Sequence, residues 1–224
     1  MDNSTYCPDL IDNSKHCFPF RRESSCIAFN KHKLDKLGVP VPDSYEDLLK
    51  PCYRGLVTMP NPKLSGAGYN FLKNLSNECG EQADLSYFDE FSTNIYQFTS
   101  SCSGPTKALV QSEALIGFCM TYQVVEEINN STPLQIIYFK ESSPWDVYSN
   151  GIMKGKSLLP EVKEVFQWIA TEGLRIDNSL YVADEVLEGV VPQIENYPKD
   201  VNYANMDGIN DIQEKNHLLA KWKY

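Results

Sequence analysis

The sequence predicts an α/β fold with a mostly parallel sheet. Short apolar runs that fit buried strands alternate with stretches that fit helices, as at 55–59 followed by 69–75 and at 94–99 followed by 106–112. This alternation is typical of parallel sheets with helices on their faces. The 224 residues, of which 42% are hydrophobic, suffice for one large or two modest domains.

The expected elements follow in order after a polar, irregular start to the chain. We expect strands at 26–30, 55–59, 94–99, 113–120, 134–139 and 147–153, and helices at 33–37, 44–50, 69–75, 84–91, 106–112, 122–128, 160–172 and 211–222. Ser44 fits the N-cap of its helix, which Pro51 would end. In the helix that begins at Pro160, Val162, Val165 and Phe166 share one face, so we expect them in the core.

Two small polar loops stand between a predicted strand and a predicted helix. One is Ser65–Gly68, and the other is Ser101–Gly104, where Pro105 suits the first turn of a helix and Ser103 or Gly104 its N-cap. Each loop would place serine hydroxyls and unpaired backbone N–H groups at the positive end of a helix, which favours an anion. Taken singly, either loop also fits an ordinary capped helix or a tight turn. Together, at the carboxyl ends of parallel strands, they predict one shared site.

Composition excludes several classes of function. The net charge of -10 argues against a nucleic-acid surface, because phosphate backbones need clustered Lys and Arg. No apolar run approaches a membrane span, and the polar Met1–Ser4 start does not resemble a signal peptide. The seven cysteines lack zinc spacing, and no catalytic triad, carboxylate pair or nucleotide loop stands out. We therefore expect no metal centre, no cofactor and no enzyme.

Several blocks of sequence resemble a known family. The blocks 42–49, 53–62, 65–69, 101–107, 117–123 and 143–149 occur in the order found in the extracellular solute-binding proteins of bacterial ABC importers, in the branch that binds iron(III), hexose phosphates or phosphonates. The resemblance implies a type II periplasmic-binding-protein-like fold. In that fold two α/β lobes close on a solute in the cleft between them. It also implies delivery to an ABC permease, and a periplasmic or extracellular, membrane-attached location.

The resemblance also implies a division of the chain. Residues 54–146 correspond to a complete lobe two. Residues 1–53 and 147–224 correspond to the hinge crossings and the C-terminal part of lobe one, which would be incomplete because family members usually carry a longer segment before Cys26. We therefore expect apolar lobe-one surface to be exposed. A truncated product without a transport role is an alternative.

For the ligand, an anionic and phosphorylated solute is the first choice. Its oxyanion would bind the two helix-start loops, and its hydroxyls would meet residues further along the chain. The predicted ligand-binding residues are Ser65, Gly66, Ala67, Gly68, Ser101, Ser103, Gly104, Thr121, Tyr122 and Glu141. Ferric iron is the alternative ligand. Iron-binding relatives use two adjacent tyrosines where this chain has only Tyr122, between Thr121 and Gln123. Each of two predicted residues has a competing interpretation. Tyr122 also fits a half-buried tyrosine of the core, and Glu141 also fits a solvated loop carboxylate. An enzyme acting on a phosphorylated substrate is a third possibility, disfavoured by the lack of a placed nucleophile or base.

Overall fold

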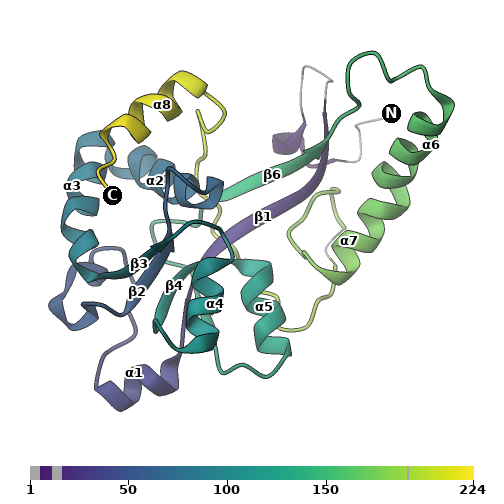
Figure 1. Cartoon of the computed structure of the whole chain (residues 1–224). Helices are drawn as coiled ribbons and strands as arrows, with labels where there is room; N and C mark the ends of the chain where they lie inside the picture. Colours follow the sequence, from purple (N-terminus) through teal and green to yellow (C-terminus); the bar gives the residue numbers. More distant parts are fainter. Residues whose placement is uncertain (1–5, 12–16, 191) are drawn as a thin grey trace. The chain divides into compact units, whose positions relative to one another are not determined.

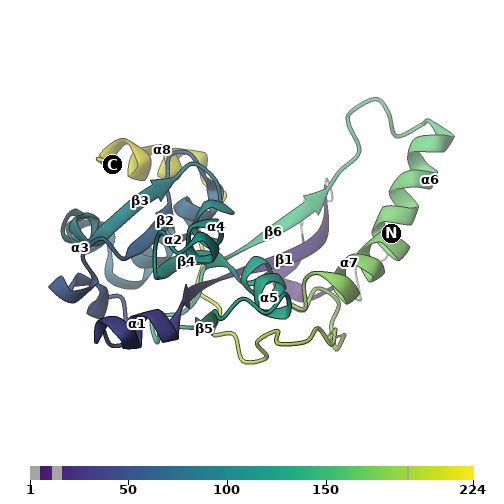
Figure 2. The same cartoon turned by 60° about the horizontal axis from the view of Figure 1, so that its bottom comes forward.

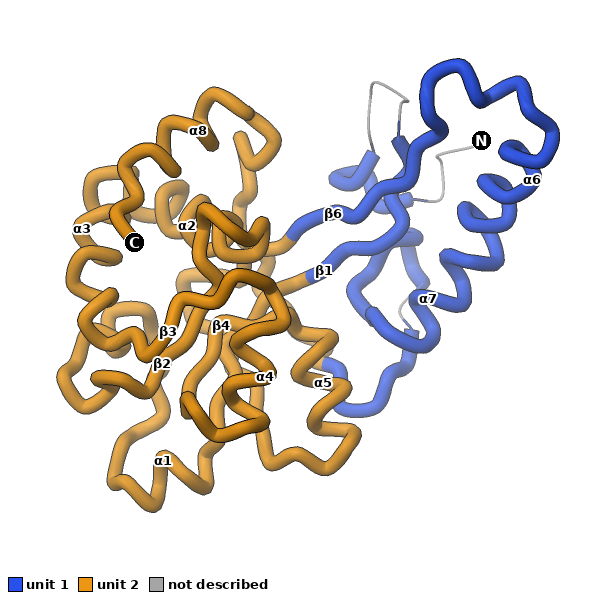
Figure 3. The backbone as a smooth tube through the Cα atoms, viewed as in Figure 1, with its two compact units in different colours: residues 1–23, 146–197 blue, residues 24–145, 198–224 orange. Residues whose placement is uncertain are grey.

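The computed structural model describes residues 6–11, 17–190 and 192–224. The chain forms two compact units, shown in different colours in Figure 3. Unit 1 comprises residues 1–23 and 146–197, and unit 2 comprises residues 24–145 and 198–224. These boundaries differ from the expected ones, because residues 24–53 and 198–224 belong to the same compact unit as residues 54–145.

Unit 2 is built on a mixed sheet. Its strands are β1 (Phe18–Phe29), β2 (Val57–Pro60), β3 (Ile95–Thr99), β4 (Ile116–Met120) and β5 (Gln135–Ile137), in the order β3-β2-β4-β1-β5. Strand β2 runs parallel to β3 and β4, as the sequence predicts, whereas β1 runs antiparallel to β4 and β5. Strand β6 (Trp145–Asn150) pairs with β1.

Helices cover both faces of this sheet. They are α1 (Lys31–Leu37), α2 (Gly66–Cys79), α3 (Glu81–Phe91), α4 (Gly104–Gln111), α5 (Thr121–Asn129) and α8 (Ile212–Lys221). The helix expected from Ser44 is instead two 3-10 turns, Asp47–Leu49 and Pro51–Tyr53. Ser44 still acts as a cap, since its hydroxyl accepts the N–H of Asp47 at 3.1 Å. Pro51 then stops the segment before an α-helix can form.

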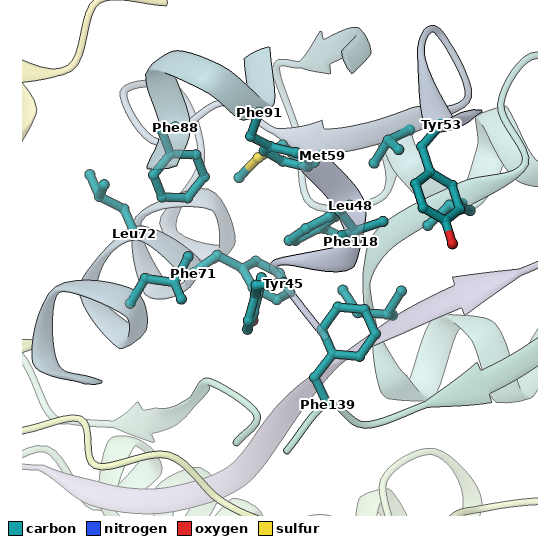
Figure 4. Packing of buried hydrophobic residues seen from close by; sticks show 14 of the residues in the cluster. Tyr45, Leu48, Tyr53, Met59, Phe71, Leu72, Phe88, Phe91, Phe118 and Phe139 are labelled. Atoms are coloured by element: carbon teal, nitrogen blue, oxygen red, sulfur yellow. The ribbon is translucent and has the colours of Figure 1, made fainter. Parts of the chain in front are cut away.

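Alternation along β1 divides the core of unit 2 into two clusters. Ile27 and Phe29 point to the larger cluster, which packs against α2, α3 and α8 and is rich in aromatic rings (Figure 4). Cys26 and Ala28 point to the smaller cluster beneath α4 and α5. Successive side chains of a strand face opposite sides of a sheet, so the two helical layers lie on opposite faces (Figures 1 and 2).

Unit 1 contains the first part of β1, most of β6 and the helices described next. Helix α6 (Pro160–Trp168) continues through a π-helical turn (Ile169–Gly173) into α7 (Leu174–Leu180), so Gly173 does not end the helical segment as expected. A 3-10 turn (Pro8–Leu10) precedes β1. The core positions expected in α6 are wrong: none of its residues is buried, and Val165 is 58% exposed. Unit 1 thus presents apolar surface, as expected from the sequence.

Candidate functional site

Three neighbouring parallel strands of unit 2 end at one edge of the sheet, and each leads into a helix. Strand β2 leads into α2 through residues 61–65, β3 leads into α4 through residues 100–103, and β4 passes directly into α5. Because β3, β2 and β4 are adjacent and parallel, the N-termini of α2, α4 and α5 gather at their common carboxyl edge. Open α/β sheets place ligands at such an edge.

These three helix starts share an electrostatic property. None has its N-cap side chain bonded to a first-turn N–H, and none carries an acidic residue in its first turn. Every other α-helix among the described residues has a side-chain cap, a first-turn acid or both. In a chain with a net charge of -10, this edge therefore keeps its positive helix ends uncompensated. That arrangement can bind an anion.

The Ser65–Gly68 loop begins α2. Ser65 is the N-cap residue, half-buried, with a hydroxyl that caps nothing, and Ala67 is likewise half-buried. A Cβ on Gly68 would lie 2.4 Å from the main-chain oxygen of Pro60, whereas one on Gly66 would meet no atom within 4 Å. Gly68 is therefore required for packing the helix against its own strand, and Gly66 leaves open space at the helix start.

The Ser101–Gly104 loop begins α4, with Ser103 as the N-cap residue as predicted. The Ser101 and Ser103 hydroxyls lie 3.3 Å apart, and neither caps the helix. A Cβ on Gly104 would lie 2.4 Å from that of Thr99, so Gly104 permits the close approach of α4 to the end of β3. The two serine hydroxyls thus stand together at the edge while the glycine has a packing role.

Helix α5 contributes Thr121 and Tyr122, but in different ways. The buried Thr121 hydroxyl accepts from Ser24 at 2.9 Å and lies 3.2 Å from the hydroxyl of Tyr138. Tyr122 is half-buried, and its hydroxyl accepts from the amide of Gln123 at 3.0 Å. Ser24 and Tyr138 are additional hydroxyls that sequence reasoning missed, because they join this edge through β1 and the segment after β5.

The amide of Gln123 connects two of the helix starts. Its Nε2 atom lies 4.0 Å from the sulfur of Cys102, between Ser101 and Ser103. Its buried Oε1 atom has no hydrogen-bond partner among the residues that the structure describes. The structure therefore brings the Ser101–Gly104 loop and Tyr122 into one neighbourhood. Gln123 belongs with the candidate residues, although nothing in its sequence context distinguishes it from a helix-surface glutamine.

Glu141 lies elsewhere in unit 2. The neighbouring Ser142 hydroxyl contacts Asn74 at 3.4 Å and Glu78 at 3.3 Å, both in the second half of α2, more than two turns beyond the helix start. The charge of Glu141 also contributes to raising the pKa of Tyr45 and Tyr87, for which burial is the larger cause. Glu141 is thus next in sequence to a residue that contacts the second half of α2, whereas the other predicted residues belong to the starts of α2, α4 and α5.

In the described part of the chain, no group of three or more His, Cys, Asp or Glu side chains is arranged to hold a metal ion. No helix in that part is long and apolar enough to cross a membrane.

The fold described above is that of a periplasmic binding protein. A family model described as bacterial extracellular solute-binding protein matches residues 5–170, and the chain belongs to that family. An uncharacterised protein of Haemophilus influenzae is 25% identical over 201 residues, which are 86% of this chain and 58% of the relative. The chain therefore spans little more than half the length of that relative.

Solved structures agree on the fold. The periplasmic binding protein P5PA has a TM-score of 0.82 at 17% identity, with 99% of this chain and 74% of that one covered. AfuA from Actinobacillus pleuropneumoniae, solved with fructose 6-phosphate, has a TM-score of 0.82 at 19% identity, with 98% and 72% covered. Iron-bound HitA from Pseudomonas aeruginosa has a TM-score of 0.78 at 15% identity, with 98% and 72% covered. The predicted type II periplasmic-binding-protein-like fold is confirmed.

Proposed function

We propose that this chain is the substrate-binding component of an ABC-type importer. It captures an anionic, phosphorylated small solute outside the cytoplasm and delivers it to a membrane permease, without catalysing a reaction. The family to which the chain belongs supports a solute-binding role in an extracellular location. The ligand class rests on the geometry of unit 2.

One observation carries the choice of ligand: three helix N-termini at one sheet edge lack both side-chain caps and first-turn acids. A phosphate group offers several oxygen acceptors to such N–H groups and is favoured by the three helix dipoles. The Ser65, Ser101 and Ser103 hydroxyls add donors beside them. The fructose 6-phosphate bound to AfuA is a ligand of the proposed class in a protein of the same fold.

Ferric iron is the second candidate, favoured by the half-buried phenol of Tyr122 at this edge and by the iron-bound neighbour HitA. A phenolate is a hard oxygen ligand suited to Fe(III). However, Tyr122 is followed by Gln123. The second phenol at this edge, that of Tyr138, comes from the segment after β5 and lies 3.2 Å from the Thr121 hydroxyl, so the chain lacks the adjacent tyrosine pair of the iron-binding relatives described above. The phosphorylated solute is therefore the stronger proposal.

A thermal-shift panel distinguishes the two ligands. A ligand at about 100 times its dissociation constant stabilises the folded state by roughly 2.7 kcal/mol, which corresponds to a rise in Tm of roughly 5–10 °C for a chain of this size. We expect this rise with fructose 6-phosphate or another sugar phosphate, and none with ferric citrate. Stabilisation by ferric citrate alone would overturn the choice of ligand.

Replacing Ser103 tests the site itself. Because the Ser103 hydroxyl does not cap α4, Ser103→Ala should leave the Tm of the ligand-free protein within about 1 °C of the wild type. Loss of one hydrogen bond to a charged ligand should weaken sugar-phosphate binding by roughly 10-fold or more. Ser86→Ala, which removes an exposed hydroxyl on α3, is the matched control and should bind normally. Wild-type affinity in Ser103→Ala, measured by isothermal titration calorimetry, would exclude this hydroxyl from the site.

A further inference from the structure

Asn61 lies between β2 and α2, and all its hydrogen-bonding groups are engaged. Its backbone N–H donates to the Thr99 carbonyl at 2.8 Å, and its own carbonyl accepts the N–H groups of Leu64 at 3.0 Å and Ser65 at 2.9 Å. Its side-chain oxygen accepts the N–H of Lys63 at 2.9 Å, and its side-chain amide donates to the main-chain oxygen of Tyr224 at 3.1 Å. One residue thus contacts three separate parts of unit 2.

Two of these contacts connect the helix-start loops of the candidate site. Through its carbonyl, Asn61 holds the N-cap residue Ser65. Through its N–H, it holds Thr99, whose hydroxyl donates to the Ser101 carbonyl at 2.9 Å and whose side chain packs on Gly104. Asn61 is therefore bonded directly to the start of α2 and, through Thr99, connected to the start of α4.

The third contact connects Asn61 to the segment Trp222–Tyr224. Lys63 reinforces it by donating from Nζ to the Trp222 carbonyl at 2.7 Å. The segment is itself fixed by aromatic packing, with the Trp222 ring 4.8 Å from Phe88 and the Tyr224 ring stacked 6.0 Å from Phe98. A segment more than 150 residues away in sequence, packed against Phe88 and Phe98, therefore bonds to the loop through two main-chain oxygens.

We propose that Asn61 is a positioning residue of the solute site, which uses the Trp222–Tyr224 segment to fix the spacing of the α2 and α4 helix starts. The proposal rests on the function proposed above. Hydrogen-bond donors must be placed to within a fraction of an ångström to act together on one anion. Asn61 and Lys63 would then affect affinity without touching the solute.

Hydrogen exchange of the ligand-free protein tests the positioning claim first, because it needs no ligand. Asn61→Ala should accelerate amide exchange both at 64–67 and at 101–104. Asn61→Asp keeps the acceptor for the Lys63 N–H but loses the donor to Tyr224, and it should accelerate exchange at the same two loops. Lys63→Met removes the hydrogen bond from Lys63 to the Trp222 carbonyl and should also accelerate exchange at both loops. This variant tests the claim if the Asn61 variants do not fold.

The matched control is Asn77→Ala. Asn77 also donates its amide to two distant main-chain oxygens, those of Asn205 at 2.8 Å and Asp207 at 3.2 Å, but it lies at the opposite end of α2. This variant should leave exchange at both loops unchanged. If exchange at 101–104 is unchanged in the Asn61 variants, or rises equally in Asn77→Ala, the positioning claim is wrong.

Calorimetric titration with inorganic phosphate and with fructose 6-phosphate then tests the consequence. Asn61→Ala should bind roughly 3- to 10-fold more weakly than the wild type, and Asn77→Ala should bind equally well. Equal affinity of Asn61→Ala and wild type would overturn the role in binding. If the wild type binds neither probe, the proposed function fails, while the exchange data still decide the positioning claim.

Discussion

Asp84 is a buried carboxyl group of unit 2. It is fully buried in the first half of α3, and neither carboxylate oxygen has a hydrogen-bond partner among the described residues. Burial, and to a lesser extent the negative charge of Glu81, raises the pKa of Asp84 to about 8. The folded protein therefore holds this carboxyl group protonated at neutral pH, whereas the unfolded chain releases the proton near pH 4.

This difference predicts the sign of a pH dependence. The pKa in the folded state is above the unfolded value, so the folded state binds the proton more tightly and the free energy of unfolding falls as pH rises from about 4 to about 8. Asp84→Asn, which stays neutral, should remove much of this fall and be more stable than the wild type at pH 8. Urea denaturation between pH 5 and pH 8.5 measures both curves.

A control separates Asp84 from the other acids. Asp35→Asn changes an exposed carboxylate that pairs with Lys31, and it should leave the slope of stability against pH close to that of the wild type. Parallel curves for Asp84→Asn and the wild type would show that Asp84 ionises without cost in the folded protein.

At the scale of elements, α8 is attached to α2 by an ion pair between Lys73 and Glu214. The two side chains differ in environment, because that of Lys73 is 3% exposed and that of Glu214 is 39% exposed. A buried ammonium group that loses its carboxylate partner retains the full cost of desolvation, whereas replacing the ammonium by an apolar chain removes that cost.

The pair therefore predicts an asymmetry between two substitutions. Glu214→Ala should lower the free energy of unfolding by about 1–3 kcal/mol, because it leaves Lys73 buried without its partner. Lys73→Met, of similar length, should cost less. Chemical denaturation of both variants and of the double variant measures the coupling, and a larger loss for Lys73→Met would contradict this account.

The elements also show where sequence reasoning succeeds. The parallel strands and the helices that follow them were predictable, because each is a local apolar run bounded by turn residues. The start of β1 at Phe18 was not. The charged run 21–23 does not resemble a strand in sequence. Its ion pairs form only in the folded chain: Arg21 pairs with Glu23 and Asp177, and Arg22 pairs with Asp9. Likewise, Asn61 and Gln123 were missed because long-range contacts give them their roles.

At the scale of the whole molecule, the candidate site lies within unit 2, whereas unit 1 presents a hollow of about 690 Å³. The hollow has a largely apolar lining that includes Phe18, Leu174 and Val190. The helical period of α6 correctly identifies an apolar face, but it could not reveal that no residue of that helix is buried. Periodicity reports which residues share a face; what covers that face depends on the rest of the fold.

Exposed apolar surface of this kind should bind a hydrophobic dye and promote self-association. We expect strong fluorescence of anilinonaphthalene sulfonate with the wild type. Val165→Lys should reduce it, with a stability change within about 0.5 kcal/mol because the side chain is 58% exposed. Glu164→Lys adds a lysine at the neighbouring exposed position and should leave the fluorescence unchanged. Equal fluorescence of Val165→Lys and wild type would show that this face of α6 does not bind the dye.

The central claim is that three helix starts of unit 2 together bind a phosphorylated solute. Amide chemical shifts recorded during a titration with fructose 6-phosphate test it most directly, because each backbone N–H reports separately. The account predicts saturable shifts concentrated at 65–68, 101–104 and 121–123, with small changes at 141–143. Shifts confined to other parts of the chain, or no saturable shifts at any of the three helix starts, would contradict it.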